Sequence, residues 1–132
     1  MSSANVFGQA ACQAATELRL GSQLTPRKVW QQVISRLSEK KSIQDKGCPR
    51  GAFLGLCEEG QIQGIPARAT GSYTKSKLNK NYAIRAIKIL RDNPRLVNDP
   101  AILWSKVCGI KKAHNNQMDV VISLWNRGLI TK

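Results

Sequence analysis

The clearest indication of the fold class lies in residues 76–92, which read SKLNKNYAIRAIKILRD. Apolar residues recur there at intervals of three and four, the period of an amphipathic α-helix. The predicted packed face holds Leu78, Tyr82, Ala83, Ala86, Ile89 and Leu90. The opposite face is almost wholly cationic, with Lys77, Lys80, Arg85, Lys88 and Arg91. The segment therefore predicts a helix that packs on one side and presents positive charge on the other.

Start and stop signals divide the rest of the chain into further helices. The expected starts are Ser2-Ser3, Thr25-Pro26, Cys48-Pro49, Asp99-Pro100 and Asn115-Asn116, where capping side chains or prolines stand at the first helical positions. The expected ends are Gly21, the polar stretch 38–46, Gly60, Asn93-Pro94, Gly109 and Gly128. No segment alternates with the two-residue period of a strand. We therefore expect an all-α protein, a compact single-domain bundle of about six helices over residues 1–132.

The third and fourth predicted helices are joined by the longest irregular stretch, residues 61–72. Gly51 and Gly55 stand four residues apart in the third helix. Because glycine has no side chain, we expect a neighbouring backbone to approach closely at this pair.

The charge of the chain indicates the class of partner. It has 21 Lys and Arg residues against 8 Asp and Glu, a net charge of +13. Residues 25–50 carry +5 and residues 67–95 carry +7, so the excess is not a basic tail added to a neutral domain. Such an excess repels itself in the folded state and is most easily explained by a polyanionic partner.

We predict that DNA or RNA binds the cationic face, mainly through its phosphates. The predicted binding residues are Arg68, Lys75, Lys77, Lys80, Arg85, Lys88 and Arg91, with Arg27 and Lys28 as further candidates. The loop 68–77 would add an anion site, because free N–H groups at a helix N-terminus attract phosphate. An acidic protein is the alternative partner, in which case the chain is an interaction module. The ordinary alternatives are a solvated face and a capped loop.

The last two predicted helices partly resemble a helix-turn-helix. Ser105 stands four residues before the turn glycine, Gly109, as that motif expects. Asn115 stands six after it, where the motif expects an apolar residue. The second helix is largely apolar and leaves few side chains to contact bases. A hairpin of core helices is the alternative interpretation.

A cysteine-dependent enzyme is the third function considered. Cys48 precedes a predicted helix and lies near Arg50, and both features favour a thiolate. His114 is the sole histidine that could serve as its base. Glu58 and Glu59 are the only acidic cluster, and adjacent carboxylates on a helix point about 100° apart. We therefore assign no catalytic residue, metal or cofactor, and an enzyme is the less favoured interpretation.

Three strings resemble those of a family of small, uncharacterised bacterial proteins. They are CPRGAFLGLCEEG at 48–60, SYTKSKLNKNYA at 72–83 and HNNQMDVV at 114–121. The resemblance implies a bacterial, single-domain protein and supplies no activity, cofactor or site residue.

The location is expected to be cytoplasmic. The four cysteines lack the paired C-x-x-C spacing and are typical of free thiols in a reducing compartment. No run of about 18 apolar residues is present, and the first residues lack the charged start of a signal peptide. We therefore expect no membrane partner.

Overall fold

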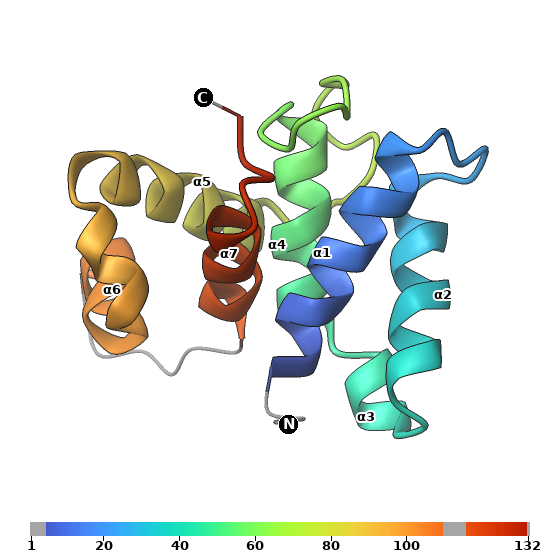
Figure 1. The fold of residues 1–132 in the computed structure, drawn as a ribbon, viewed down its shortest axis with the longest axis horizontal. Coiled ribbons are helices and arrows are strands. Elements are labelled where there is room, and N and C mark those ends of the chain that lie inside the picture. Colours follow the sequence, from blue (N-terminus) through green and yellow to red (C-terminus); the bar gives the residue numbers. More distant parts are fainter. Residues whose placement is uncertain (1–4, 110–115, 132) are drawn as a thin grey trace.

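The computed structural model describes residues 5–109 and 116–131, and this part of the chain is the all-α bundle that the sequence predicts (Figure 1). Its longer helices are α1 (Val6–Arg19), α2 (Pro26–Leu37), α4 (Gly47–Glu58), α5 (Lys77–Asp92), α6 (Pro100–Cys108) and α7 (Gln117–Asn126). A short α3 (Lys41–Gln44) and a 3-10 helix, η2 (Pro94–Asn98), lie between them. None of the helices in these two ranges has the length and apolarity needed to cross a membrane.

Local signals set most helix boundaries. The Thr25 hydroxyl accepts a hydrogen bond from the Lys28 N–H at 3.3 Å, and the Asp99 carboxylate accepts one from the Ile102 N–H at 3.2 Å. The glycines predicted as stops, Gly21, Gly60, Gly109 and Gly128, all have positive φ. One expectation is wrong: residues 38–46 are not entirely loop, because α3 forms there. The proposed starts at Ser2-Ser3 and Asn115 fall on residues outside the described ranges.

The hydrophobic core lies where α1, α4 and α7 pack against the other helices. Helix α1 packs against α2 on one side and α7 on the other, and α4 packs against α5, α7 and α2. In Figure 1, α5 crosses the molecule from α4 towards α6. Trp30 stacks on Phe53 with ring centroids 5.3 Å apart, joining α2 to α4. Tyr82 meets Trp104 edge-on at 5.0 Å, joining α5 to α6.

Helices α4 and α5 pack closely at the two glycines singled out in the sequence, against the Lys80 backbone at Gly55 and against side chains at Gly51. A Cβ on Gly55 would lie 2.7 Å from the Lys80 Cα, and one on Gly51 would lie 3.1 Å from the Ser76 Cβ. The expected close approach of a neighbouring backbone is thus confirmed at Gly55, where the partner is Lys80 in the first part of α5.

This contact rotates α5 away from the predicted orientation. Its buried residues are Lys80, Ala83, Ala86, Ile87 and Leu90. Leu78, predicted to pack, is 55% exposed, whereas Lys80, predicted to be exposed, is only 6% exposed. The cause is the missing side chain at Gly51 and at Gly55, which lets the Lys80 side of α5 lie directly against α4.

The end of the chain returns to the connection after α4. The Gln63 N–H donates to the Leu129 carbonyl at 2.8 Å, and the Thr131 N–H donates to the Gln61 carbonyl at 2.9 Å. Ile62 and Ile130 form an isolated antiparallel bridge between these two bonds. Residues 129–131 are thereby held against residues 61–63, close to the end of α5.

Candidate functional site

Lys80 belongs to a buried ion cluster and not to an exposed cationic face. Its Nζ lies 2.7 Å from Glu58 Oε1 and 2.8 Å from Glu59 Oε1. Burial opposes the charge of Lys80, but the hydrogen bonds to the two carboxylates outweigh it and raise its pKa. The predicted exposure of Lys80 is therefore wrong, and its ammonium is already neutralised within the chain. In the sequence, the adjacent Glu58 and Glu59, one turn after Gly55, were the feature from which an ion pair with Lys80 could have been predicted.

Glu58 is the centre of this cluster. Its side chain is fully buried, and its Oε2 accepts hydrogen bonds from the N–H groups of Tyr73 (2.9 Å) and Thr74 (3.3 Å). Burial alone would raise the pKa of this carboxyl. The hydrogen bonds from Lys80 and from the Tyr73, Gly71 and Thr74 backbone outweigh burial and lower the pKa to about 2. Glu58 is therefore ionised at neutral pH.

The loop before α5 does bind an anion, but the anion is Glu58. An anion site at residues 68–77 was the alternative to an ordinary capped loop, which we favoured; the N–H groups of Tyr73 and Thr74 in fact point to the Glu58 carboxylate. The Arg68 N–H also donates to the Glu58 backbone carbonyl, at 2.9 Å. The loop is thus tied to the end of α4, and these amides are not available to a ligand.

The exposed face of α5 carries the cations that remain. Lys77, Arg85 and Lys88 are exposed along it, and Lys75 is exposed just before the helix. We call these four residues the α5 cationic row. Asp92, four residues after Lys88, is exposed at the end of the helix, so the face is not wholly cationic. Because α5 rises about 1.5 Å per residue, Lys77 and Lys88 stand about 16 Å apart along its axis.

Of the other two predicted residues, Arg91 lies three residues beyond Lys88 on the same helix, and Arg68 lies beside the connection between α1 and α2. Arg91 lies at the end of α5, where its Nη2 donates to the Thr131 carbonyl at 2.8 Å and to Gln61 Oε1 at 3.3 Å. Arg68 lines a hollow with residues of the α1–α2 connection, among them Thr25 and Pro26. Arg68 therefore lies near the start of α2.

In the part of the chain that the structure describes, most of the cationic side chains have no acidic partner. Within residues 5–109 and 116–131, the only ion pairs are those of Lys80, Arg36 with Glu17 (2.8 Å) and Lys41 with Asp45 (3.5 Å). Four of the eight acidic side chains are used in these pairs. The cations of the α5 cationic row form no ion pair in that part of the chain. A dense row of unpaired cations is suited to contact with a polyanion.

The helix pair α6 and α7 does not expose a recognition helix that could contact bases. Helices α6 and α7 are separated by residues 109–116, longer than the three to four residues of a helix-turn-helix. Helix α7 packs against α1, α4, α5 and α6, and Met118, Val121 and Leu124 are fully buried. The core-hairpin interpretation is therefore the correct one.

The cysteines give no support to an enzyme. Cys48 is half-buried in the first turn of α4, and its proposed partner His114 lies outside the described residues. Burial raises the pKa of the Cys57 thiol and also that of Cys12, whose pKa the nearby Arg127 lowers only in part. None of the four cysteines forms a disulfide in the described residues. No group of three or more His, Cys, Asp or Glu residues in the described ranges is placed to hold a metal ion.

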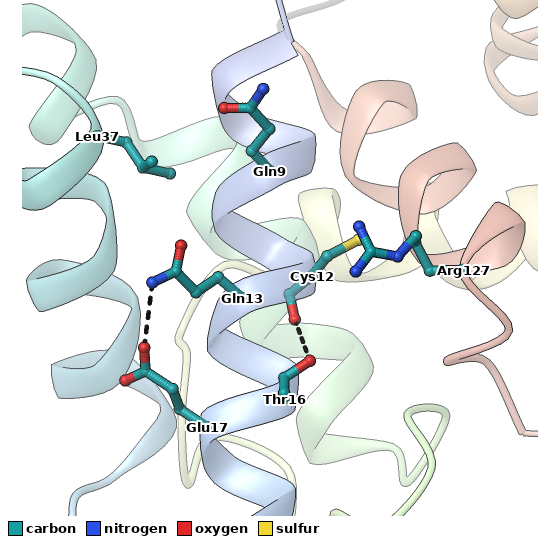
Figure 2. A pocket seen from close by; sticks show the side chains of 7 residues that line it. All are labelled: Gln9, Cys12, Gln13, Thr16, Glu17, Leu37 and Arg127. Carbon is teal, nitrogen blue, oxygen red and sulfur yellow. Dashed lines mark hydrogen bonds between the residues drawn. The ribbon is translucent and has the colours of Figure 1, made fainter.

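A hollow lies along the outer side of α1, between α2 and α7 (Figure 2). It has a volume of about 530 Å³. Figure 2 shows the Arg127 side chain reaching the Cys12 sulfur, while Gln13 donates to Glu17 at 3.3 Å. Glu17 is in turn paired with Arg36. The carboxylate in this hollow is thus already engaged, and the thiol is kept protonated.

The sequence places the chain in a known protein family. It belongs to a family of unknown function (DUF6979), whose sequence profile matches residues 4–131. This agrees with the resemblance to a family of small, uncharacterised proteins. No curated protein and no solved structure matches the chain.

Proposed function

We propose that this protein binds nucleic acid through phosphate contacts to the α5 cationic row. The observation that carries the proposal is the exposure of Lys75, Lys77, Arg85 and Lys88 without an acidic partner in the described residues. The buried side of α5 supports it, because the backbone contact at Gly55 and the Lys80 cluster hold the helix rigidly. Such a surface contacts the backbone and distinguishes sequences weakly.

The proposal assigns fewer residues to the binding site than were predicted from the sequence. Lys80 is removed because its charge is neutralised, and Arg68 is removed because it lies beside the α1–α2 connection. Four cations would release about four counterions, so log K should fall with log salt at a slope of about −3.5. The location in the cytoplasm of a bacterial cell stays a prediction.

The test is a pair of matched charge reversals. Arg85→Glu with Lys88→Glu alters the row, and Lys40→Glu with Lys106→Glu makes the same charge change at exposed positions outside α5 that were not predicted to bind nucleic acid. Binding to a labelled oligonucleotide is measured by fluorescence anisotropy between 50 and 200 mM NaCl. We expect the first pair to flatten the salt slope by about 2 and the second to leave it nearly unchanged.

Two results would contradict the proposal. Equal losses in the two variants would mean that net charge, not the α5 cationic row, governs binding. No binding by the unaltered protein at 50 mM NaCl would remove nucleic acid as the partner. An acidic protein would then be the remaining candidate for this face.

A further inference from the structure

An apolar hollow adjoins the end of the α5 cationic row. It is lined by Arg91, Trp125, Ile130 and Thr131 and has a volume of about 310 Å³. Trp125 is half-buried near the end of α7, so part of its surface is open to this hollow. Pockets of this volume are at the small end of ligand sites, with room for a single planar ring system.

Arg91 links the hollow to the row. It follows Lys88 by three residues on α5, which places the two about 4.5 Å apart along the helix axis. Its Nη2 is held by the Thr131 carbonyl at 2.8 Å, and this bond fixes the guanidinium at the edge of the hollow. Arginine has five N–H donors, so Nη1 and Nε are left for a phosphate oxygen.

The geometry points to a binding site for one unpaired base of single-stranded nucleic acid, stacked on Trp125, with its phosphates running over Arg91 and Lys88. This inference rests on the proposed function and adds the kind of nucleic acid. Proteins that bind single strands combine a cationic track with aromatic side chains on which bases stack. A duplex keeps its bases inside its own stack, so it would contact the row and leave the hollow empty.

The experiment compares single strands with a duplex. The probes are labelled (dT)15, labelled (U)15 and a 15-base-pair hairpin, and the variants are Trp125→Leu and Trp125→Phe. We expect Trp125→Leu to weaken binding to the single strands about tenfold and to leave hairpin binding within about twofold. Trp125→Phe retains an aromatic face and should lose less.

A second measurement does not depend on the folding of the leucine variant. Trp30 and Trp104 are buried, so a stacked base should quench mainly the fluorescence of Trp125. Adding (dT)15 to the unaltered protein should therefore quench tryptophan emission, and Trp125→Phe should abolish most of the quenching. The hairpin should quench little in either protein.

The outcomes separate this inference from the proposed function. If Arg85→Glu with Lys88→Glu weakens binding but Trp125→Leu affects single strands and hairpin equally, the base site is wrong and the phosphate row stands. Absence of quenching by both single strands would also overturn the base site. If the charge reversals have no effect on any probe, the proposed function itself fails.

Discussion

At the residue scale, Glu58 shows how a buried charge can be stabilised. Both of its carboxylate oxygens are used, Oε1 by Lys80 and Oε2 by the Tyr73 and Thr74 N–H groups. Removing one member of such a cluster is costly, because the remaining charge stays buried without its partner. The same carboxylate holds the loop 68–77 in place, so its loss is expected to affect stability and loop structure together.

We predict that Glu58→Gln destabilises the protein by about 3 kcal/mol. Glutamine offers one oxygen and one NH₂, so either Lys80 or the loop N–H groups would face a donor. Glu59→Gln is the matched control: Glu59 also binds Lys80, but its side chain is 43% exposed, so we expect a loss below about 1 kcal/mol. Urea unfolding at neutral pH measures both, and equal losses would contradict the central role of Glu58.

The pH dependence of stability tests the same role of Glu58. The pKa of Glu58 is lowered from 4.5 to about 2 in the folded protein, so its ionised form stabilises the fold above pH 4.5. That contribution is lost as the pH falls from 4.5 towards 2, where the folded state must also bind the proton. Glu58→Gln should flatten the fall in melting temperature over this window. An unchanged slope would show that other carboxyls cause the acid sensitivity.

At the element scale, the packing of α4 against α5 fixes what α5 shows to solvent. Gly55 meets the backbone of Lys80, and Gly51 meets Ser76 and Asn79. The orientation of the α5 cationic row thus depends on two positions in another helix.

We predict that Gly55→Ala destabilises the protein by about 3 kcal/mol, because its Cβ would lie 2.7 Å from the Lys80 Cα and force the helices apart. Gly47→Ala, in the same helix, is the control. Its Cβ would meet only the end of the Arg50 side chain, at 3.5 Å, and alanine favours a helix, so the change should be neutral or stabilising by less than about 1 kcal/mol. Thermal unfolding separates the two, and similar melting temperatures would contradict the close packing.

Helix boundaries could be predicted because their signals are local. Thr25 and Asp99 cap the turn that follows them, and Gly109 ends a helix by its own backbone conformation. The rotation of α5 could not be predicted from its own sequence. Lys80 is buried because α4 offers a gap at Gly55 and two carboxylates one turn later, and these features lie more than 20 residues away. The exposure of Lys77, Arg85 and Lys88 on α5 was therefore predicted correctly, whereas the burial of Lys80 was not.

At the scale of the whole molecule, the charge excess should limit stability. The net charge is +13, and within the described residues only Arg36, Lys41 and Lys80 are paired with carboxylates. Self-repulsion of this kind opposes the compact state and is weakened by salt.

We predict that the melting temperature rises between 0.1 and 1 M NaCl, because the screening length falls from about 10 Å to about 3 Å. A gain of about 1 kcal/mol would correspond to roughly 4 °C. Lys28→Glu with Lys40→Glu reduces the excess and should reduce the rise. A melting temperature that falls with NaCl would mean that the exposed ion pairs outweigh the repulsion.

The pairing of residues 129–131 with residues 61–63 bears on the order of folding. Its two ends are separated along the chain by α5, η2, α6 and α7. Closing so long a segment costs conformational entropy that only the packed helices between its ends can offset. The bridge at Ile62 and Ile130 is therefore expected to form last, so the hollow beside Trp125 would be completed only after the rest of the bundle has assembled.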